Sequence, residues 1–365
     1  MTEWRNLLPS QEDLAGQLLF IGVEGTAMNP DLRRRLEAVR PGGIILFARN
    51  LQDAPQVAAF CRDLHSALPV PPFLAIDQEG GRVSRLKGIL PPIPANLSLA
   101  RAAGPDALVR DHGRQTGRAL ALLGFNLNFA PVLDLSEAES PNGIGDRAYG
   151  ADPEVVGRLA RVFLEAQAAA GALGCGKHFP GLGGGRVDSH LDLPRIDRSA
   201  EEIWREDLLP YRRLHDALPM VMVGHAHYPA LQGSEPRPAT LSREVVTGIL
   251  RAKVGYRGVA LTDDLEMGAV DQHRPAGEVA LEALEAGNDL VMFCKSWERI
   301  EEAHRAIARA LKTGGLSPAR ADAALSRILS LKERLPRPGS APAFDPGSFA
   351  EICRSLGRLE EGLRA

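Results

Sequence analysis

The chain lacks the features that mark a secreted, disulfide-bonded or membrane-spanning protein. Its 365 residues include only four cysteines, Cys61, Cys175, Cys294 and Cys353, which lie far apart and form no CxxC pair. This spacing predicts neither a zinc site nor a disulfide framework, so we expect reduced and mostly buried thiols. No apolar run approaches the roughly 20 residues that span a bilayer, and residues 1–5 do not resemble a signal peptide. We therefore expect a cytoplasmic protein without a membrane span.

Neither sign of charge is in large excess. The chain has 43 lysines and arginines against 46 aspartates and glutamates, which gives a formal net charge of −3. Proteins that bind nucleic acid or anionic membranes usually carry a strong positive balance. One arginine run, Arg33–Arg35, falls on a predicted helix and is typical of a solvated helix face. We therefore expect no nucleic-acid partner and no membrane partner, and the sequence leaves the oligomeric state unknown.

Short apolar runs alternate with helical patterns along most of the chain. Eight runs are predicted as strands, each followed by a helix: 18–23, 43–47, 73–77, 125–130, 172–178, 220–225, 258–263 and 289–293. Continuous apolar strands are typical of a parallel sheet covered by helices. Eight such units favour a closed (β/α)₈ barrel of the TIM type over an open doubly wound sheet. No Gly-x-Gly-x-x-Gly follows the first strand, which argues against a dinucleotide site.

We expect a single barrel domain over residues 1–335. Its last helix should begin at Ser317 and Pro318, which have the character of an N-cap and a first helical residue. Residues 336–365 are predicted as a Pro-rich connector followed by a C-terminal helix or tail.

Polar side chains gather where five of the predicted strands end. They are Asp77, Glu79, Arg82 and Arg85 after the third strand, Asp134, Asp146 and Arg147 after the fourth, Lys177 and His178 on the fifth, His225 and His227 on the sixth, and Asp263 and Asp264 on the seventh. The carboxyl ends of barrel strands meet at one rim, where barrel enzymes place their chemistry. The sequence therefore predicts an active site at this rim.

The segment after the fifth strand holds the densest chemistry. The spacer 181–187 is too rich in glycine for a helix or a strand, so we expect a mobile loop that carries Asp188 and His190. Asp188 and His190 are two residues apart, and in an extended segment such side chains point to the same side. The carboxylate can then orient the imidazole and tune it as a proton donor and acceptor.

A metal ion is not expected at this rim, and no other cofactor is expected either. His225 and His227 alone are a weak metal signal. The cationic side chains of Arg85, Arg147 and Lys177 would also repel a metal ion.

Sugar chemistry fits this set of residues better. Carboxylates, arginine, lysine and histidine bind vicinal hydroxyls through charge-assisted hydrogen bonds. A retaining glycosidase needs a carboxylate nucleophile and a separate proton donor. Asp263 is the candidate nucleophile, with Asp264 as an alternative. His190, steered by Asp188, can replace the carboxylic acid that usually donates the proton.

From about residue 18 to 311 the chain resembles glycoside hydrolase family 3. Five motifs recur in order: Ile76–Val83, Asn128–Asp134, Asp146–Gly150, Lys177–Gly181 with Asp188-Ser189-His190, and Thr262–Met267. The Asp-Ser-His element is typical of the subgroup of bacterial β-N-acetylglucosaminidases of cell-wall recycling.

This resemblance implies a single-domain hydrolase that removes non-reducing N-acetylglucosamine from peptidoglycan fragments, with a small-molecule carbohydrate as substrate. It implies Asp263 as nucleophile and His190 as general acid/base with Asp188 as its partner. It also implies that the sugar is bound by five residues: Asp77, Arg85, Arg147, Lys177 and His178. His225 matches a further recurring position whose role stays open.

The sequence departs from the family in the loop. Many relatives have His and Asp where this chain has Leu182 and Gly184, and this difference bears on loop order, rate and aglycone preference. The alternatives are a family 3 β-glucosidase or β-xylosidase, an N-acetylglucosaminide phosphorylase, and an inactive sugar-binding barrel.

Overall fold

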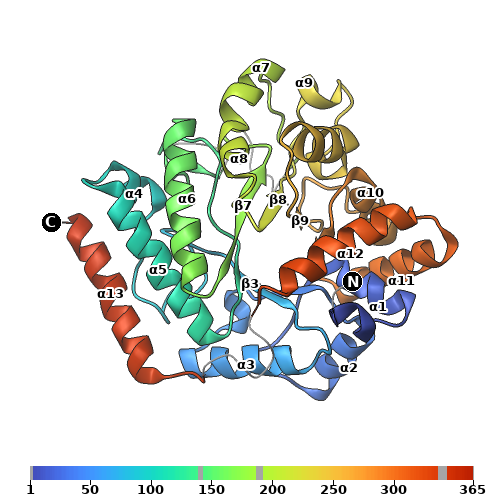
Figure 1. The fold of residues 1–365 in the computed structure, drawn as a ribbon, viewed down its shortest axis with the longest axis horizontal. Helices are drawn as coiled ribbons and strands as arrows, with labels where there is room; N and C mark the ends of the chain where they lie inside the picture. Colours follow the sequence, from blue (N-terminus) through green and yellow to red (C-terminus); the bar gives the residue numbers. More distant parts are fainter. Residues whose placement is uncertain (1–2, 139–142, 186–191, 336–342, 365) are drawn as a thin grey trace.

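The computed structural model of the chain describes residues 3–138, 143–185, 192–335 and 343–364. Eight parallel strands close into a barrel in the order β1-β10-β9-β8-β7-β6-β3-β2. They are β1 (Leu19–Gly22), β2 (Gly43–Ile45), β3 (Phe73–Ile76), β6 (Leu127–Asn128), β7 (Leu173–Phe179), β8 (Met220–Val223), β9 (Val259–Asp264) and β10 (Leu290–Phe293). The predicted (β/α)₈ barrel is confirmed, and each predicted strand overlaps one of these (Figure 1).

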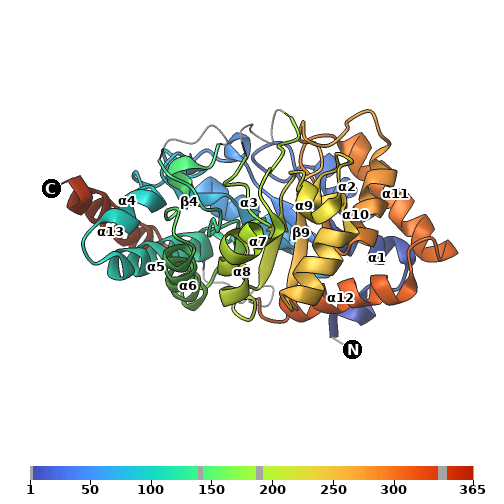
Figure 2. The same ribbon diagram turned by 90° about the horizontal axis from the view of Figure 1, so that it is seen from above.

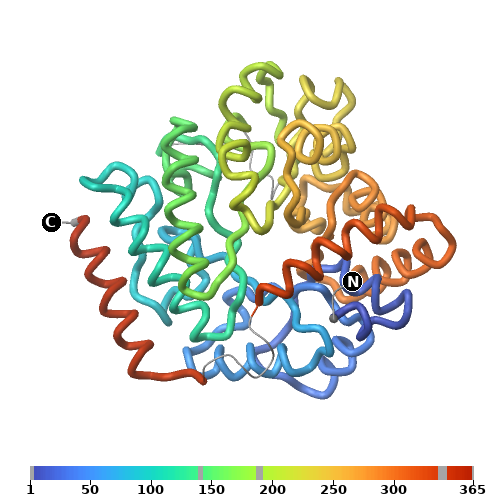
Figure 3. Tube along the Cα trace, in the orientation of Figure 1, coloured from blue at the N-terminus to red at the C-terminus, as the bar shows by residue number. Residues whose placement is uncertain are grey.

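Helices surround the barrel, and the chain passes around it from blue to orange before its red C-terminal helix returns to lie beside the cyan segment (Figure 3). The longer helical segments are α2 (Pro30–Val39), α3 (Ala54–Ser66), α5 (Pro105–Leu123), α6 (Pro153–Ala169), the π-helical η6 (Glu244–Lys253), α10 (Ala276–Ala286) and α11 (Trp297–Thr313). The predicted helix 200–217 divides into α7 (Ala200–Glu202), the π-helical η4 (Ile203–Asp207) and α8 (Leu209–Leu214). The shorter ones are η1 (Glu3–Leu7), α1 (Gln11–Gln17), η2 (Ala48–Asn50), α4 (Asn96–Arg101), η3 (Gly145–Arg147), α9 (Pro229–Gln232) and η5 (Ala239–Leu241).

Several helices begin where the sequence supplies an N-cap. The side chains of Asn29, Asp53 and Asp152 accept hydrogen bonds from free backbone N–H groups at the starts of α2, α3 and α6. A proline follows each cap within two residues, where its missing N–H costs no helical hydrogen bond. These local signals fix the points at which each strand-to-helix loop must end.

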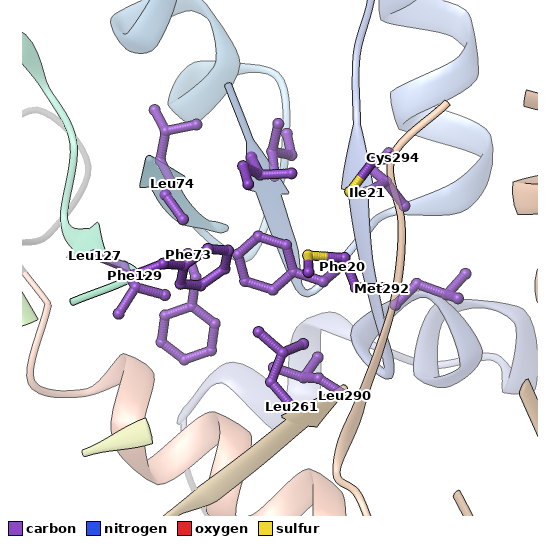
Figure 4. Close-up of a cluster of buried hydrophobic side chains, with 14 of the residues drawn as sticks. Phe20, Ile21, Phe73, Leu74, Leu127, Phe129, Leu261, Leu290, Met292 and Cys294 are labelled. Atoms are coloured by element: carbon purple, nitrogen blue, oxygen red, sulfur yellow. The ribbon is translucent and has the colours of Figure 1, made fainter. Parts of the chain in front are cut away.

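Apolar side chains fill the inside of the barrel. The rings of Phe20 and Phe129 pack with their centroids 5.3 Å apart, and Leu261 and Met292 close the same cluster (Figure 4). Because this cluster is buried and continuous, the barrel is a packed core and not a channel. A ligand can therefore enter only above it, at the rim where the strands end.

A small antiparallel sheet follows β3 and shapes one side of that rim. It pairs β4 (Gln78–Gly80) with β5 (Val83–Ser84). The turn between them uses Gly80 and Gly81, both with positive φ, and a Cβ at Gly80 would lie only 2.6 Å from the carbonyl oxygen of Pro94. The turn returns the chain so that the N–H of Arg85 donates to the carbonyl of Asp77.

The opposite end of the barrel, where the strands begin, is covered by α12 (Pro318–Lys332) (Figure 2). Asp289 at the start of β10 is fully buried and pairs with Arg251, Arg320 and Arg327 at 2.6, 3.2 and 2.8 Å. Arg320 and Arg327 come from α12, so this carboxylate attaches the helix to the strand ends. Removal of one partner from such a buried network is expected to cost several kcal/mol, about 3–5 in comparable cases.

The C-terminal helix α13 (Pro346–Arg364) packs against α5 on the outside of the barrel. The predicted C-terminal helical extension is therefore confirmed. All four cysteines are free, and Cys61, Cys175 and Cys294 are buried, as predicted. Within the described residues, no helix is both long and apolar enough to cross a membrane.

Lys332, at the end of α12, is a buried cation without a described carboxylate partner. Its Nζ donates to Gln17 Oε1 at 2.8 Å and lies 5.3 Å from the centre of the Phe73 ring. Burial lowers the pKa of Lys332 to about 7. Between this value and the pKa of an exposed lysine, the unfolded chain holds a proton that the folded chain has lost. The contribution of Lys332 to the free energy of unfolding must therefore rise with pH in this range.

We predict that Lys332→Met removes this dependence. From pH 7 to 9 the free energy of unfolding of the wild type should rise relative to that of the variant, by at most about 1.4 kcal/mol per pH unit. Urea unfolding at pH 7, 8 and 9 measures the free energy of unfolding of both proteins. The buried thiols also make this free energy depend on pH, but wild type and variant share that effect, so it cancels in the difference. Lys312→Met, at an exposed position on α11, is the control and should keep the wild-type slope. Parallel curves for wild type and Lys332→Met would contradict the prediction.

Candidate active site

A cavity of about 540 Å³ opens at the rim formed by the strand ends. Six residues predicted from the sequence line it together: Asp77, Arg85, Arg147, Lys177, His178 and Asp263. Phe129 and Met292 of the apolar core form part of its floor. A second cavity, of about 630 Å³, lies at the other end of the barrel beside α12 and contains none of the predicted site residues.

Glu79 is the centre of a buried ion network in the rim cavity. Arg147 donates to both of its carboxylate oxygens at 2.8 Å, and Lys177 Nζ lies 2.7 Å from Oε1. Burial alone would raise the pKa of Glu79, but Arg147 and Lys177 outweigh it and hold that pKa well below its usual range. The Glu79 side chain is only 1% exposed, so it organises the two cations and has little surface left for a ligand.

Lys177 joins this network to Asp77. Its Nζ donates to Asp77 Oδ1 at 2.7 Å, and Arg85 reaches the other oxygen of Asp77 at 3.5 Å. Burial opposes the charge of Lys177, but Asp77 and Glu79 more than offset it, so the pKa of Lys177 is raised. The wall of the cavity is thus a row of fixed ions of alternating sign, which suits the donor and acceptor pattern of adjacent sugar hydroxyls.

Asp134, on the loop after β6, determines how His178 presents its ring. Its Oδ2 lies 2.7 Å from His178 Nδ1, and its Oδ1 accepts the backbone N–H of Leu182 at 2.7 Å. A buried carboxylate at this distance keeps the proton on Nδ1. The other ring nitrogen, Nε2, lies 3.5 Å from the Arg147 guanidinium, in the cavity that both side chains line.

The end of β9 carries two adjacent aspartates that both line the cavity, Asp263 and Asp264. From Leu261 to Asp264, β9 advances by three residues while its partner β10 advances by two. Strand β9 therefore contains a bulge between these two residues. A bulge re-aims side chains that would otherwise alternate between two faces. The same irregularity occurs in β7, where Gly176 pairs with Val221 but Phe179 pairs with Val223.

The two carboxylates have different surroundings. Asp264 is buried, and its Oδ1 accepts the backbone N–H of Glu266 at 3.0 Å. Burial raises the pKa of Asp264 to about 6. Asp263 is partly exposed to the cavity, and the backbone N–H of Asp264 donates to its Oδ1 at 2.8 Å. The backbone thereby holds Asp263 in one orientation toward the open space.

His225 holds the backbone at the end of β9 through a hydrogen bond to the carbonyl of Asp264. It is fully buried, with Nδ1 2.7 Å from the Thr240 hydroxyl and Nε2 3.0 Å from the carbonyl oxygen of Asp264. Since a carbonyl only accepts, Nε2 carries the proton and Nδ1 accepts from Thr240. In the part of the chain that the structure describes, no three His, Cys, Asp or Glu side chains are grouped so that they could hold a metal ion.

The first residues of the glycine-rich loop are well anchored. Tyr228 donates its hydroxyl hydrogen bond to the carbonyl of Gly181 at 2.7 Å. A Cβ at Gly183 would lie 1.8 Å from the carbonyl oxygen of Leu135, so only glycine fits there. Leu182 is 6% exposed and packs against Gly224. The position where many relatives have a histidine is therefore an apolar contact here. The predicted Asp188 and His190 lie outside the described residues.

Two residues of the site, Glu79 in the cavity wall and Asp134 beside His178, received no role from the sequence, although both were named among the polar strand ends. Glu79 is two residues after Asp77, and this spacing places both side chains on one side of an extended segment. Asp134 ends the Asn128–Asp134 motif. Glu79 and Asp134 share one sequence feature that could have identified them: each is a carboxylate at a strand end, close in sequence to a residue that was already a candidate.

Comparison with known proteins identifies a family. Residues 11–331 match the family described as the glycosyl hydrolase family 3 N-terminal domain. A protein of Alkalilimnicola ehrlichii named beta-hexosaminidase is 40% identical over 288 residues, which cover 77% of this chain and 82% of the relative. A beta-hexosaminidase of Pseudomonas aeruginosa is 36% identical over 291 residues, covering 80% and 86%.

Solved structures agree with this family. A glycoside hydrolase family 3 beta-N-acetylglucosaminidase from Paenibacillus sp. str. FPU-7 has a TM-score of 0.85 and 34% identity, over 95% of this chain and 68% of that one. Native NagZ from Neisseria gonorrhoeae has a TM-score of 0.72 and 28% identity, over 86% and 97%. Since the family match extends over nearly the whole barrel and includes the cavity, the chain belongs to glycosyl hydrolase family 3 and is a glycoside hydrolase.

Proposed function

We propose that the protein is a retaining exo-β-N-acetylglucosaminidase that removes the non-reducing N-acetylglucosamine from peptidoglycan fragments in the cytoplasm. The observation that carries the proposal is the shared cavity, in which Asp263 meets the cluster of Asp77, Arg147 and Lys177 above a closed apolar floor. A floor of this kind admits the end of a saccharide but not its passage, which favours removal of a terminal sugar. The names of the relatives support the sugar class.

The catalytic unit in this proposal is the barrel over residues 1–335. Residues 336–365 are then a connector and C-terminal helix outside this unit, and the described part, α13, packs on the outer side of α5.

The proposed mechanism has two steps at the anomeric carbon. Asp263 attacks this carbon and forms a covalent glycosyl-enzyme while His190, oriented by Asp188, protonates the leaving oxygen. The same imidazole then removes a proton from water, which attacks the glycosyl ester and restores the configuration. Asp77, Arg85, Arg147, Lys177 and His178 hold the sugar hydroxyls. The roles of Asp188 and His190 rest on the family motif.

The substrate class can be tested with a panel of aryl β-glycosides. We expect hydrolysis of the aryl N-acetylglucosaminide and much slower hydrolysis of the glucoside and the xyloside. Repeating the assay in phosphate buffer should still give free N-acetylglucosamine with retained configuration, followed by NMR. A sugar 1-phosphate as the main product would identify a phosphorylase instead. Binding of N-acetylglucosamine without any turnover would indicate an inactive sugar-binding barrel.

We predict that Asp263→Asn abolishes turnover, with a loss of at least about a thousandfold in kcat, because the amide cannot form the glycosyl ester. Asp264→Asn is the matched control. It changes a carboxylate that is buried and already bonded to the Glu266 N–H, so a large part of the activity should remain. Thermal unfolding of both variants checks the fold. The opposite ranking of the two variants would move the nucleophile to Asp264.

For His190→Ala we predict losses that depend on the leaving group. An aryl glycoside with an acidic phenol needs little protonation and should be slowed far less than a disaccharide, whose leaving alcohol needs a full proton. The measurement is kcat/KM for a series of aryl N-acetylglucosaminides of increasing phenol pKa. A steeper dependence on that pKa in the variant supports the acid role, and equal losses along the series would count against it.

A further inference from the structure

The sugar-binding residues occupy only one part of the cavity wall. In barrel order, the residues proposed to hold the terminal sugar follow β3, β6 and β7, and Asp263 lies on β9. On the other side of Asp263, strands β10, β1 and β2 form an arc to which no role has been given above. From this arc, Phe47, Arg49 and Lys295 line the same cavity.

Arg49 is held across this arc by contacts from two strand ends. Its guanidinium stacks over the Phe47 ring at 4.6 Å, and its Nη2 donates to the carbonyl of Cys294 after β10 at 2.8 Å. The buried side chain of Asn50 fixes the underlying turn by accepting the Phe47 N–H and donating to the carbonyls of Val23 and Gly25. The arginine is thus a preorganised donor, because it need not be ordered when a ligand arrives.

The charge at this edge favours an anion. Lys295 is a second exposed cation there, and its Nζ donates to the carbonyl of Glu266 at 3.1 Å. The Glu266 carboxylate is turned away, because it accepts the backbone N–H groups of Lys295 and Ser296. Two further carboxylates lie nearby: Asp264, which interacts electrostatically with Lys295, and Glu24, 3.4 Å from Arg49 Nε, whose side chain is 65% exposed. Such an exposed pair is weak, so a ligand carboxylate can compete for Arg49.

The arc adjoins the carbon from which the leaving group departs. The terminal sugar is held by the β3, β6 and β7 side and its anomeric carbon faces Asp263. The next sugar therefore begins beside Asp263, on the face of that carbon opposite the carboxylate, and the closed apolar floor directs it outward. We propose that Phe47, Arg49 and Lys295 form the binding site for this leaving-group sugar and select a sugar that carries a carboxylate, such as N-acetylmuramic acid. The inference rests on the proposed function and assigns its aglycone preference to these residues.

The test compares two disaccharides that differ only in the carboxylate-bearing lactyl ether: N-acetylglucosaminyl-β-1,4-N-acetylmuramic acid and N,N′-diacetylchitobiose. Arg49→Gln should lower kcat/KM for the first about tenfold more than for the second, the effect of one charge-assisted hydrogen bond at a partly exposed site. Glu24→Gln should shift the preference the other way, because it removes a competing carboxylate. Arg49→Lys should restore part of the preference.

Arg34→Gln is the matched control. Arg34 makes an exposed ion pair with Asp31 on α2 at 3.0 Å, and its loss should leave the ratio of the two kcat/KM values unchanged. Added salt should reduce the preference of the wild type more than that of Arg49→Gln, in which Lys295 is the remaining cation of the proposed site. Equal losses on both disaccharides, or an unchanged ratio in Arg49→Gln, would overturn the inference. Failure of the wild type to cleave any N-acetylglucosaminide would instead overturn the proposed function on which it rests.

Discussion

The cavity depends on the charges around Glu79. This carboxylate is almost fully buried and pairs with both Arg147, from the segment after β6, and Lys177, from β7. An isolated buried charge costs several kcal/mol, so the buried Glu79 depends on these two cations. The network therefore couples the ends of β3, β6 and β7. The same contacts that bring the strand ends together also leave Asp77, Arg85 and His178 facing the open space, ready to bind hydroxyls.

A second coupling joins this network to the loop. Asp134 receives hydrogen bonds from the His178 ring and from the backbone of Leu182, so the orientation of a sugar-binding imidazole and the start of the glycine-rich loop depend on one carboxylate. Leu182 adds an apolar contact where many relatives have histidine. The loop thus begins from a rigid base, and the departure from the family motif has a packing role of its own.

The two ends of the barrel use buried charge for different purposes. At the strand starts, Asp289 binds three arginines and attaches α12, while Lys332 is buried with only an amide oxygen as its acceptor among the described groups. Neither contacts the rim cavity. The apolar core thereby separates the buried charges that stabilise the fold from the cavity at the strand ends, and substitutions at one end of the barrel need not disturb the other.

Sequence by itself determined the strands, the barrel class and six of the charged or polar residues that line the cavity, because apolar runs and polar strand ends are local patterns. Only the tertiary structure decided which carboxylate faces which cation or ring, and so gave Glu79 and Asp134 their roles. It also showed that β7 and β9 each contain one extra residue relative to a neighbouring strand. This brings consecutive residues, Lys177 with His178 and Asp263 with Asp264, to one cavity, although strict alternation would separate them. The register between two strands is set by residues that are distant in sequence, so it cannot be predicted from the residue pattern of one strand.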